Sequence, residues 1–193
     1  VAERIVATRS GVQFTVRGTP CNSPLVGRFI VGNMLAGLTV GISEGLLISA
    51  MSEAVAQIAV LPGRMEYVQA GQPFDVMVDY AHTPESLDAV YRTLRATLAE
   101  KGKNGNLICV LGAAGGVRDR WKRPLMGAIA GVWGNEVFIT NEDPYDEPPM
   151  AIMREVAGGV SRARELYANH FGPEAFADVP EHRLANADLV EDR

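Results

Sequence analysis

The residues best suited to chemistry lie in polar segments that directly follow apolar ones. The segment Asp79–Pro84 (DYAHTP) comes after the apolar run Phe74–Val78 and combines a carboxylate, a phenol and an imidazole. At a strand end, with a proline opening the next helix, these groups could bind ribose hydroxyls or a phosphate near the helix N-terminus. The alternative is structural: Asp79 or Thr83 caps the helix, and His82 is a surface residue.

A glycine-rich, basic segment follows the apolar run Leu107–Leu111. Its glycines, within Gly112–Arg123 (GAAGGVRDRWKR), permit close backbone approach to an anion. Four cations fall within six residues: Arg118, Arg120, Lys122 and Arg123. Unpaired cations oppose the dipole at a helix N-terminus, so this cluster indicates a bound anion or carboxylate partners. The glycine spacing does not match the G-x-G-x-x-G fingerprint of dinucleotide-binding proteins.

An acidic segment, Asn141–Pro149 (NEDPYDEPP), follows the apolar run Val137–Thr140 and carries four carboxylates in six positions. It could bind an ammonium group, accept arginine pairs from the basic segment, or form a solvated turn, and composition does not choose among these. A fourth element, the turn Pro62–Glu66, places Arg64 beside a candidate domain boundary. There Arg64 could bridge two domains, contact a ligand or be solvated.

Strands and helices alternate in the part of the chain that carries these segments. Strands are expected at Met65–Gln69, Phe74–Asp79, Leu107–Leu111 and Val137–Thr140, and helices at Pro84–Ala99, Arg123–Val132 and Met150–Asn169. This alternation is typical of an α/β fold with a mostly parallel sheet and helices on both faces. Since βα loops meet at the carboxyl ends of parallel strands, we expect Asp79, Arg118 and Asp143 at one sheet edge.

The first 62 residues have a different pattern. Strands are expected at Arg4–Thr8 and Val12–Arg17, and helices from Asn33 onward and over Glu44–Gln57. Ser43 is a plausible N-cap for the second helix. Proline and glycine at positions 62 and 63 then indicate a turn, and we place a domain boundary near Gly63.

Composition bounds the class of protein. The chain has 193 residues, of which 47% are apolar, and a net charge of −5. The acidic balance argues against a nucleic-acid partner. The most apolar stretch, Phe29–Met51, is interrupted by polar residues and glycines, which argues against a membrane span. The two cysteines have neither disulfide-framework nor zinc-site spacing, so we expect a cytoplasmic location.

Both ends of the sequence indicate a piece of a longer chain. The first residue is Val1 rather than methionine, and the last 22 residues, Gly172–Arg193, lack a clear period. We therefore expect this tail to be a loop whose next strand lies beyond the chain.

Four motifs in this order and spacing resemble the Mur ligases. They are Gly27–Asn33 (GRFIVGN), Pro62–Glu66 (PGRME), Asp79–Pro84 (DYAHTP) and the basic loop through Arg118–Pro124 (RDRWKRP). Within that superfamily, the hexapeptide DYAHTP together with KRPLM is most similar to the UDP-N-acetylmuramoyl-tripeptide synthetases. The resemblance covers roughly residues 24 to 160.

The resemblance implies an ATP-dependent ligase of three domains. Residues 1–62 would end the central ATPase domain, and 63–193 would form most of the Rossmann-like, amino-acid-binding C-terminal domain, incomplete at its end. The sequence has no match to the family's P-loop, G-x-x-G-K-[ST] in type. The Walker lysine, the carbamylated lysine and most Mg²⁺ ligands would therefore precede Val1, and this chain alone would be inactive. The implied substrates are ATP, UDP-MurNAc-dipeptide and a free amino acid.

The resemblance also assigns residues to the nucleotide. Asn33 matches the family asparagine at the adenine, Arg64 the inter-domain arginine that contacts the nucleotide, and Asp79 the ribose-binding aspartate. His82 belongs to the same nucleotide loop.

A second set of residues is assigned to the incoming amino acid. Arg118 matches the arginine that holds its carboxylate, although the loop carries one residue more than the commonest family form. Glu142, Asp143 and Tyr145 stand where diaminopimelate-adding members have Asp-Asn-Pro-Arg, with Tyr145 in place of the arginine. Without this arginine, and with acids on both sides of Tyr145, the loop is poorly suited to bind a second carboxylate of the substrate. This favours an amino acid whose side chain ends in an amine, such as lysine or ornithine.

Two other functions stay open. Folylpolyglutamate or cyanophycin synthetases form similar amide bonds, but Thr83-Pro84 differs from the His-Asn-Pro usual in the folate members. A non-catalytic Rossmann-like binding module would have the same fold. A P-loop and a carbamylatable lysine upstream would favour the ligase.

Overall fold

The computed structural model describes residues 1–100, 105–116, 119–179 and 185–190. The chain divides into two compact units, Val1–Tyr80 and Ala81–Arg193, called the first and second unit below. The first unit thus extends past Gly63, and the assignment of 1–62 and 63–193 to two domains stays a prediction. No helix in the described ranges is long and apolar enough to cross a membrane.

The first unit begins with a three-stranded antiparallel sheet. Its strands, in spatial order, are β1 (Ala2–Thr8), β2 (Gly11–Val16) and β3 (Thr19–Ser23). Alternate residues of β2 are buried, as expected for a sheet with one covered face. Sequence reasoning missed β3 because Pro20 lies within it. Pro20 pairs with Thr15 on an edge strand, where a residue without an N–H is tolerated.

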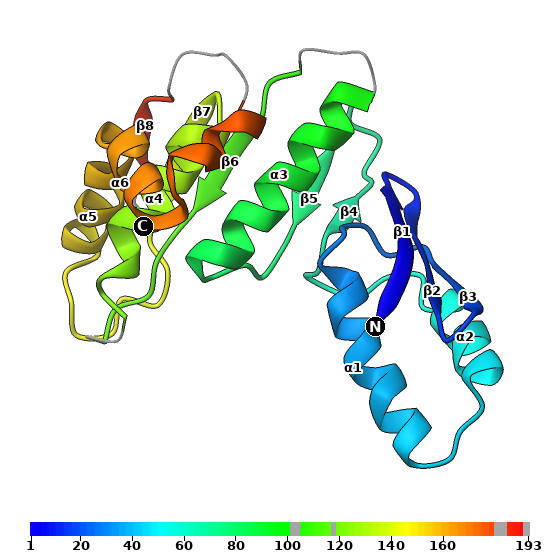
Figure 1. The fold of residues 1–193 in the computed structure, drawn as a ribbon. Coiled ribbons are helices and arrows are strands. Elements are labelled where there is room, and N and C mark those ends of the chain that lie inside the picture. The colour runs from blue at the N-terminus through cyan, green and yellow to red at the C-terminus, as the bar shows by residue number, and fades with distance from the viewer. Residues whose placement is uncertain (101–104, 117–118, 180–184, 191–193) are drawn as a thin grey trace. The chain divides into compact units, whose positions relative to one another are not determined.

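Two helices, α1 (Ile30–Ser43) and α2 (Ile48–Ala56), pack on this sheet (Figure 1). The core joins sheet and helix residues, namely Val12, Phe14, Val16, Cys21, Val31 and Leu38. Ser43 is not the N-cap of the second helix. It is the last residue of α1, and its hydroxyl donates to the Val40 carbonyl. Gly45, at φ 80°, ends α1, so α2 begins four residues later than predicted.

A short antiparallel hairpin completes the first unit. Its strands are β4 (Glu66–Val68) and β5 (Val76–Val78), with Tyr67 opposite Met77. The expectation that Phe74–Asp79 belongs to the parallel sheet is therefore wrong in the described structure. The tight turn around Gly71 favours pairing between adjacent strands over a longer crossover.

The second unit contains the predicted parallel sheet. Its strands lie in the order β6 (Ile108–Leu111), β7 (Glu136–Thr140) and β8 (Ala187–Val190). Helix α3 (Pro84–Glu100) precedes β6, and α4 (Lys122–Trp133) connects β6 to β7. Between β7 and β8 lie α5 (Pro149–Ser161), α6 (Ala163–Phe171) and the 3₁₀-helix η1 (Pro173–Asp178). The α/β class is confirmed. The tail is not only a loop, because β8 lies within it.

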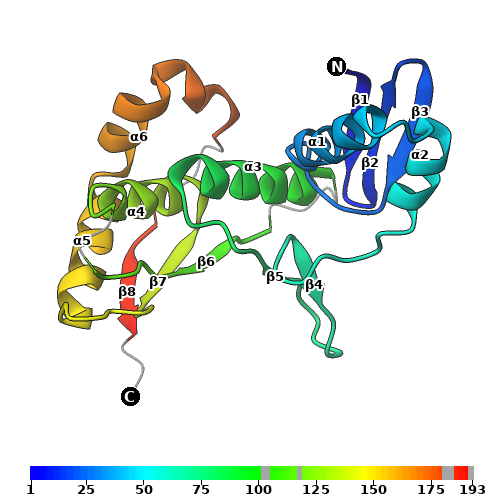
Figure 2. The same cartoon turned by 90° about the horizontal axis from the view of Figure 1, so that it is seen from below.

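Two further expectations for this unit are corrected. The single helix predicted over 150–169 is two helices, because the chain turns at Arg162 (φ −114°, ψ 25°). In the described residues the helices cover one face of the sheet, where Val137 and Ile139 are fully buried (Figure 2). On the opposite face Ile108 and Val110 are 55% and 67% exposed, so no second helical layer covers β6 there.

A polar cluster joins three helices of the second unit. The buried Asp88 carboxylate accepts hydrogen bonds from Trp133 Nε1 and the Tyr167 hydroxyl, both at 2.7 Å, and from Arg92 Nε at 2.7 Å. The Tyr167 hydroxyl also accepts from Arg92 at 2.9 Å. These bonds fix α3 against α4 and α6.

Candidate functional site

The loop after β6, called the basic loop below (residues 112–123), and the loop after β7, called the acidic loop (residues 141–148), lie against each other in the second unit. The Gly115 N–H donates to the Asp143 carbonyl at 3.0 Å. A Cβ placed on Gly115 would lie 2.0 Å from the Pro144 carbonyl oxygen, and one on Gly112 would lie 2.9 Å from the Glu142 Cβ. The glycines that the sequence suggested for anion binding therefore allow the backbone of one loop to approach the other.

Arg123 joins these two loops to a helix. Its side chain is 1% exposed, and its guanidinium donates to both Glu147 carboxylate oxygens at 2.8 Å. It also donates to Glu155 Oε2 at 3.1 Å and to the Ala114 carbonyl at 2.9 Å. Hydrogen bonding to Glu147 is the main cause that raises the pKa of Arg123. The bidentate pair is the geometry that an arginine fork supports best.

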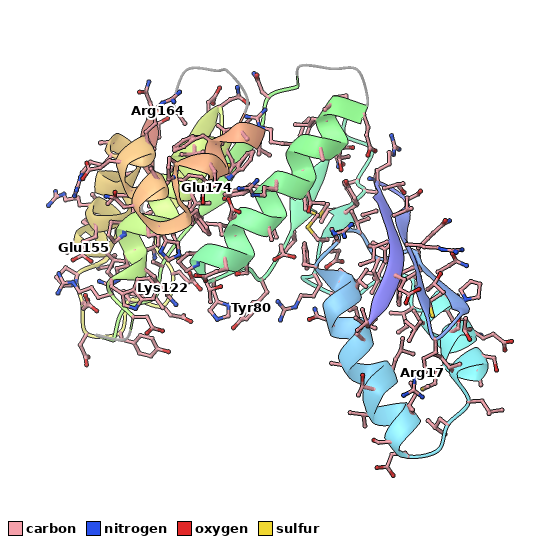
Figure 3. All side chains as sticks on the ribbon, in the orientation of Figure 1. Arg17, Tyr80, Lys122, Glu155, Arg164 and Glu174 are labelled. Atoms are coloured by element: carbon pink, nitrogen blue, oxygen red, sulfur yellow. The ribbon has the colours of Figure 1, made fainter. Side chains whose placement is uncertain are left out.

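The other described cations of the basic loop also have carboxylate partners. Arg120 donates to Glu155, which lies on α5, and Lys122 Nζ lies 3.8 Å from Asp119 Oδ2. Figure 3 shows the labelled side chains of Lys122 and Glu155 among the sticks of the second unit. The bond from Arg120 is the main cause that lowers the pKa of Glu155. Of the two interpretations of the basic cluster, carboxylate pairing is confirmed for Arg120, Lys122 and Arg123.

Arg118 lies outside the described residues. Glu142, Asp143 and Tyr145 are exposed in the loop after β7, and the Tyr145 side chain is 72% exposed. Tyr145 has a left-handed backbone, with φ of 50°, and its ring lies 3.5 Å from where a Gly116 Cβ would be. The acidic loop thus presents these three side chains to solvent while Glu147 turns inward to Arg123.

In the first unit, hydrogen bonds join the turn that carries Arg64 to the segment that carries Asp79. Asp79 Oδ2 accepts the Met65 N–H at 2.8 Å, and the Tyr80 N–H donates to the Gly63 carbonyl at 2.8 Å. The Arg64 guanidinium carbon lies 5.0 Å from the Tyr80 ring centroid, a cation–π contact. Met65 has φ of 48°, a strained conformation that the Asp79 bond supports.

The other two predicted nucleotide residues are exposed. Asn33 lies on α1 in the first unit, and His82 lies two residues before the start of α3 in the second. At the start of α3, Thr83 Oγ1 accepts the Ser86 N–H at 3.3 Å, and Ser86 Oγ accepts the Thr83 N–H at 3.1 Å. The capping alternative is therefore confirmed for Thr83. Asp79 instead supports the Met65 turn.

Sequence reasoning missed the role of Arg123, which it counted only as one of four cations. The available signal was its position, because Arg123 opens a helix in which Leu125 through Trp133 are all buried. A charge at the start of such a helix must either reach solvent or find partners. Among the described residues, no group of three or more His, Cys, Asp or Glu side chains is placed to hold a metal ion.

Comparison with known protein families gives one match over most of the chain. The profile described as "Mur ligase, glutamate ligase domain" matches residues 63–188. The match includes the turn with Arg64, the segment with Asp79 and both loops of the second unit.

Two curated relatives and a solved structure extend this similarity. The chain is 44% identical over 189 residues to the UDP-N-acetylmuramyl-tripeptide synthetase of Roseiflexus sp. (strain RS-1), covering 95% of this chain and 35% of that protein. It is 37% identical over 166 residues to the UDP-N-acetylmuramoyl-L-alanyl-D-glutamate–2,6-diaminopimelate ligase of Bacillus cereus, covering 83% and 32%. The chain thus spans about a third of each relative's length.

The fold is similar to that of the UDP-N-acetylmuramate-alanine ligase of Thermotoga maritima. The TM-score is 0.62 at 18% identity, and the alignment covers 99% of this chain and 37% of that one. At this identity the likeness concerns the fold alone.

Proposed function

The chain belongs to the Mur ligase family, and we propose that it is part of an ATP-dependent ligase that adds the third amino acid to UDP-MurNAc-dipeptide in peptidoglycan precursor synthesis. Residues 1–62 would end the ATPase domain, and 63–193 would form most of the amino-acid-binding domain. The observation that carries the proposal is the family match at 63–188, which spans two loops joined at the carboxyl ends of β6 and β7. Ligands of open α/β sheets bind at this edge.

In the proposed reaction, the dipeptide carboxylate attacks the γ-phosphorus of ATP, ADP leaves, and an acyl phosphate forms. The amine of the incoming amino acid attacks the acyl carbon, the amide bond forms, and phosphate leaves. This chain would supply positioning and electrostatic stabilisation. The lysines and most of the Mg²⁺ ligands for phosphoryl transfer would lie in sequence before Val1.

On the nucleotide side, we assign Asn33, Arg64, Asp79 and His82 to ATP. The turn at Gly63–Met65 supports this assignment, because Asp79 accepts the N–H of Met65, the residue after Arg64, and Arg64 contacts the ring of Tyr80, the residue after Asp79. A guanidinium suits a phosphate, and a carboxylate suits ribose hydroxyls.

On the amino-acid side, we assign Arg118 to the substrate carboxylate and Glu142, Asp143 and Tyr145 to its far end. The exposure of these three side chains beside the basic loop supports the assignment. Glu142 and Asp143 are acidic and Tyr145 carries no positive charge, which favours a substrate ending in an amine. Relatives named as diaminopimelate ligases make diaminopimelate the competing substrate.

Steady-state assays of the complete polypeptide with lysine, ornithine and meso-diaminopimelate test both assignments. A charge-assisted hydrogen bond contributes about 1.5–3 kcal/mol, so Arg118→Ala should raise the amino-acid KM roughly ten- to a hundredfold and leave the ATP KM unchanged. Tyr145→Arg should shift preference toward diaminopimelate.

Three results would count against the proposal. Wild-type preference for diaminopimelate would refute the role of Tyr145. An unchanged amino-acid KM in Arg118→Ala would remove that residue from the site. Binding without turnover would instead indicate a non-catalytic module.

A further inference from the structure

We propose that Arg123 is a positioning residue for the amino-acid substrate. By holding the loops after β6 and β7 at a fixed spacing, it would set the positions of Glu142, Asp143 and Tyr145, which the proposed function assigns to the substrate. This inference rests on the proposed function and adds to it a residue that touches no substrate.

The first observation is that the acidic loop is tied at two points. Asp143 is bound through its carbonyl to the Gly115 N–H, and Glu147 is bound through its carboxylate to Arg123. Tyr145 lies between these ties. The Glu147 N–H also donates to the Pro144 carbonyl at 3.0 Å, which closes the turn around Tyr145. Loosening the Arg123 tie would therefore release the segment that carries the proposed specificity residues.

The second observation is that Arg123 also binds the opposite loop. Its guanidinium donates to the Ala114 carbonyl, next to Gly115, and to Glu155 on α5. One buried side chain thus contacts the basic loop, the acidic loop and helix α5. Lysine has a single ammonium group on a flexible stem and cannot match this planar arrangement of donors.

The third observation separates positioning from simple stabilisation. Arg123 is enclosed at the start of a helix whose other buried residues are apolar, and its Nε has no hydrogen-bond partner among the described residues. Burying a guanidinium in this way carries a desolvation cost, and an apolar residue of similar size often stabilises a fold equally well. Unlike an apolar residue, Arg123 can hold the basic loop and the acidic loop at a fixed distance through its hydrogen bonds.

The test compares Arg123→Lys, Arg123→Met and Glu147→Gln in the complete polypeptide. We expect Arg123→Met and Glu147→Gln each to raise the amino-acid KM by about tenfold, with the ATP KM within about twofold of wild type. The double variant Arg123→Met/Glu147→Gln should raise the amino-acid KM by less than the product of the two single increases, because both substitutions break the same Arg123–Glu147 contact. Arg162→Gln, which removes the exposed pair with Glu165, is the matched control and should change neither KM.

A second readout does not depend on catalysis. Hydrogen exchange at the Gly115 amide, measured on the 193-residue chain by NMR, should be at least about tenfold faster in Arg123→Lys and Glu147→Gln than in wild type. Amides of β2 in the first unit should be unaffected.

The outcomes are distinguishable. An unchanged amino-acid KM in folded variants, or an equal rise in the ATP KM, would overturn the positioning role. Unchanged Gly115 exchange would show that Arg123 does not hold the loops together. If Arg123→Met fails to fold, the lysine and Glu147 variants decide. A wild-type polypeptide without ligase activity would refute the proposed function and the substrate role together, whereas the exchange result would still report on the tie.

Discussion

Charged side chains in the second unit differ in what their pairing contributes. Arg162 and Glu165 form an exposed pair on the surface, where solvent screening leaves little stabilisation. Arg123 is buried and contacts four acceptor atoms on three segments. Removing a partner from a buried group leaves an uncompensated charge, so the buried cluster is far more sensitive to substitution.

A buried thiol gives a prediction at the same scale. Burial raises the pKa of Cys109 from 9.0 to about 12, so the thiol stays protonated at pH 8 and does not react. In a Cys21→Ala background, alkylation of the native chain by iodoacetamide at pH 8 should be at least about tenfold slower than in urea. Because the folded-state pKa is raised, the associated stability is present below pH 9 and is lost as the pH rises toward 12. Equal labelling rates would contradict the burial of Cys109.

At the scale of elements, α4 and α5 approach each other through glycines. A Cβ on Gly159 would lie 1.7 Å from the Pro124 carbonyl oxygen, and one on Gly127 would lie 1.9 Å from the Val156 carbonyl oxygen. The two helix backbones are therefore in direct contact. This contact places Glu155 of α5 within reach of Arg123 at the start of α4.

Adjacent glycines on α5 provide a matched pair of variants. Gly159→Ala should destabilise the second unit by about 1–3 kcal/mol, because the added methyl forces the helices apart. Gly158 has open space around it, so Gly158→Ala should stabilise the helix by about 0.5–1 kcal/mol. Urea unfolding followed by circular dichroism measures both. A similar effect of the two substitutions would mean that the helices do not pack as described.

The Asp88 cluster gives a second prediction for the helices. Asp88→Ala leaves Arg92, Trp133 Nε1 and the Tyr167 hydroxyl without their shared acceptor, and should cost about 3–5 kcal/mol. Tyr167→Phe removes the bond to Asp88 and the bond from Arg92 but keeps the carboxylate, and should cost about 1.5–3 kcal/mol. Glu165→Ala, on the same helix as Tyr167, should stay within about 0.5 kcal/mol. Denaturant midpoints that rank differently would refute the cluster's role in holding α3 against α4 and α6.

At the scale of the whole molecule, each compact unit has its own buried core. The first unit builds its core between an antiparallel sheet and two helices, and the second between a parallel sheet and helices α4 and α5. The net charge of the chain is −5, and the described cations of the basic loop are paired with carboxylates of the same unit. Stability should therefore depend on those carboxylates being ionised.

The free energy of unfolding, measured as a function of pH, tests whether stability depends on ionised carboxylates. The pKa of Glu155 is lowered from 4.5, chiefly by Arg120, so its contribution is fully present above pH 4.5 and is lost as the pH falls through the lower folded-state value. Glu155→Gln should flatten the acid limb of the stability curve, measured by urea midpoints from pH 3 to pH 7. Glu165→Gln should change the curve less, because the Arg162–Glu165 pair is exposed to solvent. Identical acid limbs for wild type and Glu155→Gln would contradict this assignment.

Several elements could be predicted from local pattern. The helix Pro84–Glu100 was expected to end one residue earlier, and strand β6 lies within the expected run Leu107–Leu111. The break at Arg162 could not be predicted, because the helical apolar period continues through it. Strand β8 was missed for a related reason: four residues are too short for a period, and pairing with β7 decides their conformation.

The sequence alone determined the α/β class, the order of the loops and the family resemblance, because each depends on residues close together in the chain. The tertiary structure alone decided which charges meet. Arg123 and Glu155 are separated by 32 residues, and Gly115 and Asp143 meet only because β6 pairs with β7 in parallel. Such contacts depend on how helices and strands pack, and the same four cations could have faced solvent, a ligand or these carboxylates. Packing selected the carboxylates for the three that the structure describes.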